Sequence, residues 1–161
     1  MAGTDLAVRV ERLEAIEDLR RLKFDYTWHL DNKDWAAFKE CFTEDFAFEG
    51  TGLQLTREDF IATVRNAMDP LETSHELHQH QFDFDGPDRA KGIWRLRDHL
   101  VAPGRRSEFR GRAVYEETYV RTGRGWRIAS TNLRYLSSQG SVGIGRGPAD
   151  TAMGLVIVRG S

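Results

Sequence analysis

The sequence predicts an α+β fold in which N-terminal helices lie against a long antiparallel sheet. Apolar residues recur at spacings of three and four through most of residues 7–70, which is typical of amphipathic helices. From His75 the period changes to two, as in half-buried strands, and turn residues divide that part into four segments. Helices followed by a run of strands favour α+β over a parallel α/β sheet.

The first helix is expected over residues 7–30. Its apolar positions form one stripe, made of Val8, Leu13, Ile16, Leu19, Leu22, Tyr26 and Leu30. Residues 30–34 break this pattern and contain Asp and Asn residues that can cap a second helix over 35–42. The stripe should face the sheet.

A short strand is expected over residues 46–50, ending in a glycine-containing turn. A third helix should begin where Thr56 can cap it, with Asp59 at the position of a capping-box acid. Pro70 should end this helix, because proline removes a backbone donor and clashes with the preceding turn.

Four strands should follow, and a sheet of this length should curve into a cone that encloses an apolar pocket beside the first helix. The expected strands cover residues 75–85, 90–102, 108–121 and 126–137. Residues 1–137 then form one domain. Residues 138–161 are a Gly-rich tail that we expect to pack on the domain or on a neighbouring subunit.

Composition excludes several classes of protein. The chain has 161 residues, 40% of them hydrophobic and 30% charged, so it is too apolar for a disordered chain. No apolar run approaches the roughly 20 residues that cross a membrane. The net charge of −2 gives no overall electrostatic case for binding nucleic acid.

Two further features bear on location. The N-terminus is polar from its first residues, so we expect no secretory signal and a cytoplasmic protein. A single cysteine, Cys41, excludes a disulfide framework and a cysteine-cluster zinc site. We expect this cysteine to be buried.

The second strand should carry a carboxylate toward the core. On one face, alternation places Gly92, Trp94, Leu96, Asp98 and Leu100, and on the other Ile93, Arg95, Arg97, His99 and Val101. A core-facing carboxylate is costly unless it has a hydrogen-bonding partner. Asp98 is therefore a candidate functional group, although it could instead be solvated near the end of the strand.

The first strand offers the partner. It contains His75, His78 and His80, and a turn at residues 85–88 would bring its start beside the end of the second strand. His75 and Asp98 are then plausible cross-strand neighbours. A metal site on His78 and His80 is the less favoured alternative, because no third ligand is obvious nearby.

The first helix offers Tyr26 and Asp31. Tyr26 lies on the apolar stripe, and a buried tyrosine hydroxyl usually needs a partner. Asp31 lies at the end of the helix, where it could take part in the site or merely cap the next helix.

Several spaced segments form a recognisable set, made of Ile16–Leu19 through Tyr26, Leu30–Trp35, Phe42–Asp45, Asp85-Gly86, Tyr115–Arg121 and Gly125–Ile128. Together they resemble SnoaL-like domains of the NTF2-like superfamily. The resemblance implies an NTF2-like cone, a curved antiparallel sheet wrapped around N-terminal helices. The set Tyr26, Asp31, His75 and Asp98 is similar, in order and approximate spacing, to the catalytic set of bile acid 7α-dehydratases, and more distantly to that of scytalone dehydratases.

This resemblance implies a cofactor-independent dehydratase acting on a hydrophobic, carbonyl-activated cyclic substrate. His75 would be the general base, oriented by Asp98, while Tyr26 would bind the carbonyl oxygen and Asp31 would position Tyr26 or the substrate. The substrate would contact Phe24, Trp28, Trp94, Leu96 and Tyr115. Neither a metal nor an organic cofactor is expected.

Two other functions stay open: a ketosteroid-isomerase-like isomerase or polyketide cyclase, and a non-catalytic ligand-binding protein. We also expect a homo-oligomer, a dimer or trimer. Its interface should involve the arginine-rich side of the second strand or the tail.

Overall fold

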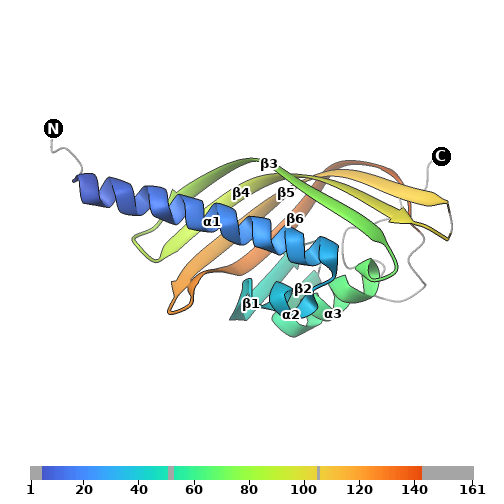
Figure 1. The fold of residues 1–161 in the computed structure, drawn as a ribbon, viewed down its shortest axis with the longest axis horizontal. Helices are drawn as coiled ribbons and strands as arrows, with labels where there is room; N and C mark the ends of the chain where they lie inside the picture. Colours follow the sequence, from blue (N-terminus) through green and yellow to red (C-terminus); the bar gives the residue numbers. More distant parts are fainter. Residues whose placement is uncertain (1–4, 51–52, 105, 143–161) are drawn as a thin grey trace.

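The computed structural model describes residues 5–50, 53–104 and 106–142. In chain order its elements are α1 (Leu6–Asn32), α2 (Trp35–Lys39), β1 (Phe42–Gly50), β2 (Leu53–Thr56), α3 (Arg57–Met68), β3 (Glu72–Phe84), β4 (Arg89–Ala102), β5 (Ser107–Thr122) and β6 (Gly125–Gly140). The strands form one sheet in the order β2-β1-β6-β5-β4-β3 (Figure 1). The predicted α+β class is confirmed.

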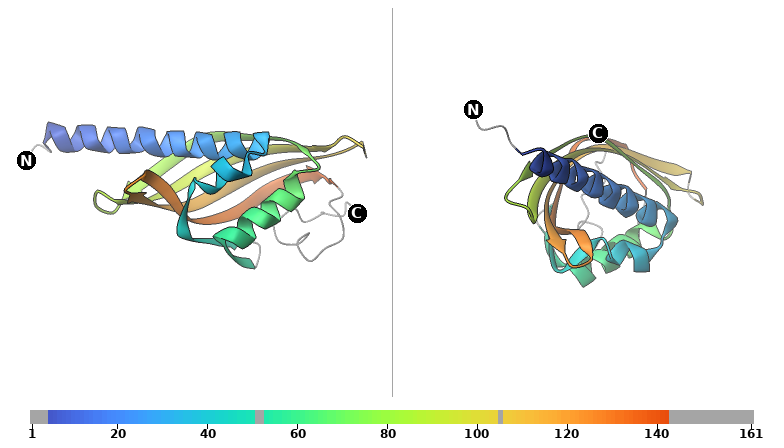
Figure 2. Two further views of the ribbon diagram at one scale, coloured as in Figure 1. Left: turned by 60° about the horizontal axis from the view of Figure 1, so that its bottom comes forward. Right: turned by 60° about the vertical axis from the view of Figure 1, so that its left-hand side comes forward.

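The sheet is curved and unclosed, and the helices lie along its concave side (Figure 2). The pairs β3–β4, β4–β5 and β5–β6 are antiparallel, whereas β1 runs parallel to β6. Because α1 runs along the sheet, its inner face and the inner residues of β3 to β6 surround a single core. This arrangement is the predicted cone.

Helix ends follow the expected local chemistry. The Asp34 carboxylate accepts from Ala37 N at 3.1 Å and caps α2. Thr56 Oγ1 accepts from Asp59 N at 3.3 Å and caps α3, as predicted. Lys33 ends α1 in the left-handed region, with φ of 60°.

Several boundaries differ from the predictions. Helix α2 ends at Lys39 rather than at residue 42, and β3 begins at Glu72 rather than at residue 75. Strand β1 begins at Phe42 rather than at residue 46, because its first residues pair irregularly with β6 and show no clear alternation. Strand β2 is an addition to the predicted elements, and β6 extends to Gly140 rather than to residue 137. Of the predicted tail, residues 143–161 lie outside the described residues.

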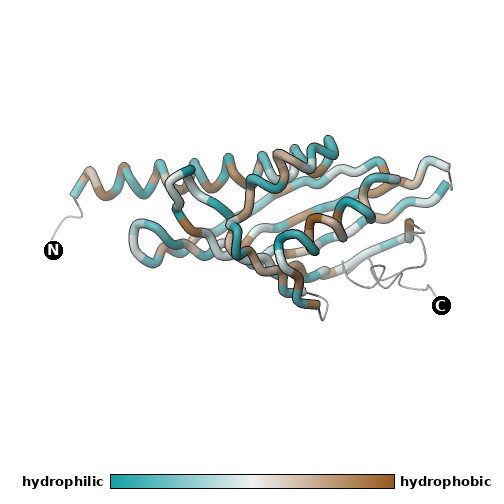
Figure 3. Tube along the Cα trace, turned by 90° about the horizontal axis from the view of Figure 1, so that it is seen from below, coloured by the Kyte–Doolittle hydropathy of each residue, from teal (hydrophilic) through white to brown (hydrophobic). Residues whose placement is uncertain are grey.

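The predicted stripe of α1 is correct only from Ile16 onward. Leu19 and Leu22 are buried against the sheet, whereas Val8 and Leu13 are 52% and 66% exposed. The first turns of α1 extend past the edge of the sheet (Figure 1), which leaves Val8 uncovered. Leu13 belongs to another face of the helix, and apolar segments continue through these outer turns (Figure 3).

A buried ion pair that the sequence does not predict joins α1 to the sheet. Lys23 Nζ lies 2.6 Å from Glu117 Oε1, and both side chains are fully buried. Thr131 Oγ1 donates to the same carboxylate at 3.0 Å. Burial lowers the pKa of Lys23, while the attraction of Glu117 opposes that shift.

Removing one partner of this pair should destabilise the fold more than removing both. We expect Lys23→Met to lower the free energy of unfolding by about 3–5 kcal/mol, because it leaves an unpaired buried carboxylate. The double variant Lys23→Met/Glu117→Gln should recover most of this loss. Urea unfolding at neutral pH measures both variants. Equal losses in the single and double variants would contradict an electrostatic origin.

Candidate functional site

The register of β3 on β4 brings two of the predicted residues together. His75 lies directly opposite Asp98, as predicted. The inner face of β4 also carries the predicted residues, since Trp94, Leu96, Asp98 and Leu100 are all buried. A bulge interrupts β3 between Leu77 and His80, beyond His75, so it does not change which way the His75 side chain points.

The hydrogen-bond partner of His75 is Asp31 rather than Asp98, which corrects the prediction. Asp31 Oδ1 lies 2.6 Å from His75 Nδ1, and Asp31 Oδ2 accepts from His75 N at 2.9 Å. Thr73 Oγ1 also donates to Asp31, at 2.8 Å. Asp31 is the last acidic residue of α1, so the end of that helix is tied to the start of β3.

The Asp31 carboxylate is held in its ionised form. Burial opposes ionisation, but the hydrogen bonds and charge of His75, with the Thr73 hydroxyl, lower the pKa of Asp31 below its usual value. An ionised Asp31 accepts a hydrogen bond from Nδ1–H, so Nε2 is the ring nitrogen that remains for proton exchange. The His75 side chain is 5% exposed and that of Asp31 is 25% exposed, so the pair is shielded but reachable.

Asp98 is bound by Tyr135, a residue outside the predicted set. The Tyr135 hydroxyl donates to Asp98 Oδ2, while Asp98 Oδ1 is buried and has no hydrogen-bond partner among the described residues. Burial raises the pKa of Asp98, although the Tyr135 hydroxyl opposes the shift. Alternation along the fourth predicted strand, inward at Leu133 and therefore at Tyr135, is the signal that could have found this residue.

Backbone space next to Asp98 is also restricted. Gly111 faces Asp98 across the β4–β5 pair, and a Cβ at this glycine would overlap Asp98 Oδ1. Only glycine leaves room for the carboxyl group in this position.

Tyr26 and Tyr115 form the third part of the site. Their hydroxyl oxygens are 3.5 Å apart, and both residues are buried. The Lys23 ammonium lies 3.9 Å from the centre of the Tyr26 ring and 3.7 Å from that of Tyr115. Burial raises the pKa of both phenols, so they stay protonated and can donate.

These groups surround a small internal cavity. Its volume is about 20 Å³, which suits about one water molecule. The lining residues are Tyr26, Leu30, Phe48, Phe60, Val64, Met68, His75, Leu96, Asp98, Tyr115, Thr131, Leu133 and Tyr135. The prediction of an apolar interior is correct, but in this conformation the cavity is much too small for a cyclic substrate.

A larger groove of about 710 Å³ lies outside, between α1 and β3. It is lined by Phe24, Trp28, Trp94, Asp31 and His75, among others. Phe24 and Trp28 are each 58% exposed, so they lie outside the enclosed pocket that we expected to hold the substrate. Their helix face points away from the core, and Leu96 and Tyr115 alone of the five predicted contacts line the cavity.

His75 therefore lies between the internal cavity and the outer groove. Among the described residues it alone lines both the internal cavity and the outer groove. The predicted residues divide into an inner set around Asp98 and an outer set around Asp31, and His75 joins the two.

The other histidines of β3 are differently placed. His78 is exposed, and His80 stacks on Trp94 with ring centres 4.6 Å apart. Within the described ranges, no group of three or more His, Cys, Asp or Glu side chains is arranged to hold a metal ion.

A family model of SnoaL-like domains matches residues 11–132. The chain belongs to this SnoaL-like family. Its fold is NTF2-like, as the resemblance implied. No curated protein matches the sequence. Among the helices that the structure describes, none has the length and apolar character needed to span a membrane.

Solved structures support the same fold. A scytalone dehydratase-like protein from Novosphingobium aromaticivorans is 20% identical with a TM-score of 0.77, over 81% of this chain and 90% of that one. A type 2 LinA hexachlorocyclohexane dehydrochlorinase is 19% identical with a TM-score of 0.74, over 87% and 97%. A protein of unknown function from Mycobacterium tuberculosis is 24% identical with a TM-score of 0.70, over 93% and 82%.

The environment of Asp98 predicts a pH-dependent effect of Asp98→Asn. A raised native pKa means that wild-type stability falls as pH rises from about 4 toward that pKa, because the folded state must release a proton that it binds tightly. Asparagine removes this penalty. The stability of Asp98→Asn relative to wild type should therefore increase from about pH 4 to pH 7 in denaturant unfolding. A constant difference would show that Asp98 is not protonated preferentially in the fold.

Proposed function

We propose that this protein is a cofactor-independent lyase that eliminates water from a hydrophobic, carbonyl-activated cyclic substrate. The observation that carries the proposal is the Asp31–His75 pair, at 2.6 Å, beside the buried hydroxyl and carboxyl groups of the cavity. A base and several proton donors facing one small space are what an elimination requires.

His75 is the general base in this scheme. Its Nε2 removes the proton from the carbon next to the carbonyl group, and the electron pair moves to the carbonyl oxygen to form an enolate. The Asp31 carboxylate keeps the ring in the reactive tautomer and stabilises the imidazolium that results. The roles assigned to the two carboxylates from the sequence are thus revised, with Asp31 replacing Asp98 beside the imidazole.

The donors act on the oxygen atoms. Tyr26, supported by Tyr115, donates a hydrogen bond to the developing enolate. Asp98, whose pKa is raised by burial, is the acid in this scheme and gives a proton to the leaving hydroxyl group, which departs as water while the carbon–carbon double bond forms. A carboxylic acid that burial keeps neutral can serve as a donor in this way. The proton on His75 then returns through the site to Asp98, so the reaction consumes nothing but substrate.

The substrate carbonyl group accepts the electrons, so the proposed reaction needs no metal or organic cofactor. Apolar walls such as Phe48, Phe60 and Leu133 suit a ring-containing substrate. Because the cavity holds about one water, binding must move these walls apart. Two structurally similar proteins are a dehydratase and a dehydrochlorinase by name, and both names denote eliminations, which supports this reaction class.

Isomerisation is the second candidate. The Tyr26 and Asp98 donors would stabilise the same enolate if His75 returned its proton to another carbon, and a cyclase would use that enolate as a nucleophile. A non-catalytic ligand-binding protein would use these groups only as structural hydrogen bonds. Product mass and the presence of turnover separate these functions from dehydration.

The proposal is tested with a panel of cyclic β-hydroxy ketones, including steroid-like and aromatic polyketide-like compounds. We expect a product that has lost one water, observed by mass spectrometry. His75→Ala should lower kcat at least about a hundredfold, because proton transfer is its task. His78→Ala, an exposed histidine of the same strand, is the matched control and should keep full activity. A product of unchanged mass would favour isomerisation, and retained activity in His75→Ala would exclude His75 as the base.

Asp31→Asn tests the revised role of Asp31. The amide can fill the same space, but it does not stabilise an imidazolium and can favour the wrong tautomer. We expect kcat to fall by about a hundredfold or more, with the circular dichroism spectrum unchanged. If Asp98→Asn abolished turnover while Asp31→Asn did not, the assignment of Asp98 as the orienting group would be restored.

A further inference from the structure

Helix α1 carries a second apolar face in addition to the one that packs on the sheet. The residues of this outer face are Leu6, Val10, Leu13, Phe24 and Trp28, with exposed fractions of 68%, 44%, 66%, 58% and 58%. Positions three and four apart lie above one another on a helix, so these residues form a single row with Glu17 and Arg20 between them. We call this row the outer stripe.

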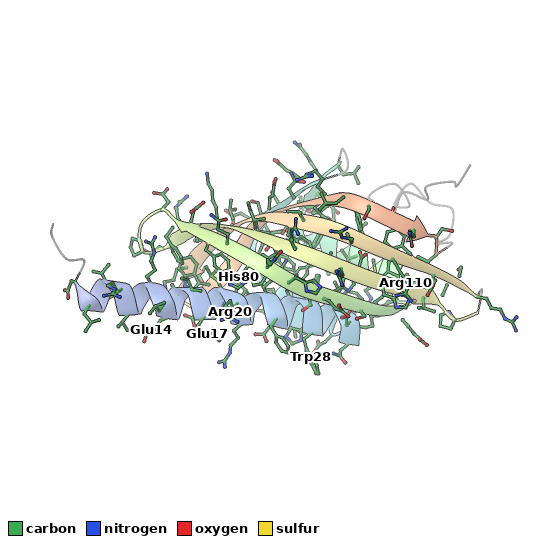
Figure 4. All side chains as sticks on the ribbon, turned by 90° about the horizontal axis from the view of Figure 1, so that it is seen from above. Glu14, Glu17, Arg20, Trp28, His80 and Arg110 are labelled. Carbon is green, nitrogen blue, oxygen red and sulfur yellow. The ribbon has the colours of Figure 1, made fainter. Side chains whose placement is uncertain are left out.

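The outer stripe is divided into two apolar clusters by charge. Leu6, Val10 and Leu13 form the N-terminal cluster. Phe24 and Trp28 form the C-terminal cluster, with their rings stacked at 5.8 Å. Between them Arg20 Nη1 lies 3.2 Å from Glu17 Oε2, and both side chains are more than half exposed. Figure 4 shows Glu17, Arg20 and Trp28 along the same outer edge of α1.

No described residue covers the outer stripe, and its two apolar clusters are exposed on either side of the Glu17–Arg20 pair. The stripe has the pattern of a self-complementary surface. Its two apolar clusters flank a central pair of opposite charges. A two-fold axis midway between Glu17 and Arg20 would therefore place the N-terminal cluster of one copy against the C-terminal cluster of the other, and each charge against the opposite charge.

We propose that two copies of this chain form a homodimer in which their α1 helices pack antiparallel through the outer stripe. Glu17 of each copy then faces Arg20 of the other, and Leu13 of each copy faces Phe24 of the other. A parallel pair would instead place Glu17 against Glu17 and Arg20 against Arg20. Opposite charges within an apolar helix seam therefore select the antiparallel orientation.

This dimer would change the surroundings of the outer groove. Phe24 and Trp28 line that groove together with Asp31 and His75. In the antiparallel pair, the first turns of the partner helix extend beside these aromatic rings and cover one rim of the groove. The second copy would thereby restrict access to the side of His75 that bears Asp31.

The mass of the full chain in solution tests the proposal. Light scattering after size exclusion should give twice the chain mass of 18.4 kDa. Leu13→Glu should convert the dimer to a monomer with an unchanged far-ultraviolet circular dichroism spectrum, because Leu13 is exposed in the single chain and its replacement leaves the fold intact. Leu136→Glu is the matched control, since Leu136 is 46% exposed but lies on β6. It should leave the dimer intact.

Cross-linking tests the orientation. In the antiparallel dimer, an oxidised mixture of Leu13→Cys and Phe24→Cys chains should yield disulfide-linked pairs, whereas Leu13→Cys alone should not. Its two copies would be about 16 Å apart along the helix axis. The native Cys41 does not compete, because it is buried and burial raises the pKa of its thiol to about 12.

Four results would overturn the proposal. The first is a wild-type protein that is monomeric or trimeric in solution. The second is a dimer that is lost in Leu136→Glu but retained in Leu13→Glu. The third is efficient disulfide cross-linking of Leu13→Cys chains in the absence of Phe24→Cys chains. The fourth is a monomer that binds phosphatidylglycerol vesicles through Leu13, which would make a membrane surface the occupant of the stripe.

Discussion

The contact between Asp31 and the start of β3 is the constraint on which the site depends. One carboxylate at the end of a long helix accepts from a backbone amide and a hydroxyl and is paired with the ring of His75. The strand backbone and the Thr73 hydroxyl hold this carboxylate in place, so rotation of the ring would break its hydrogen bond to a fixed acceptor. The fold therefore fixes the orientation and the tautomer of the imidazole together.

Ionisable groups inside the core are paired with groups from other elements. Lys23 of α1 binds Glu117 of β5, and Asp98 of β4 binds Tyr135 of β6. Among the carboxylates that line the cavity or support it, the second oxygen of Asp98 is the exception, because it is buried without a partner among the described residues. The Lys23–Glu117 pairing thus accounts for both of those charges, whereas this oxygen is a buried polar atom that pairing within the described residues does not satisfy.

Periodicity predicted the fold class and the inner face of β4, including Asp98, because alternation depends on neighbouring residues alone. It could not predict that Asp31 rather than Asp98 binds His75, since that choice depends on where α1 ends over the sheet. Phe24 and Trp28 lie outside the enclosed pocket, contrary to expectation, because α1 has two apolar faces and the sequence does not show which one meets the sheet. The burial of Lys23 gives no sequence signal, because a lysine is seldom buried and only its partner on β5 makes that burial possible.

The burial of the phenols has a consequence for behaviour in alkali. All four tyrosines of the chain lie in the interior, and burial raises the pKa of each above its ordinary value. Unfolding above about pH 10 would release these protons, so the native state loses stability as the solution becomes more basic. The near-ultraviolet absorbance of tyrosinate should then rise in a single step with the collapse of the fold, and the protein contains its own optical indicator of alkaline denaturation.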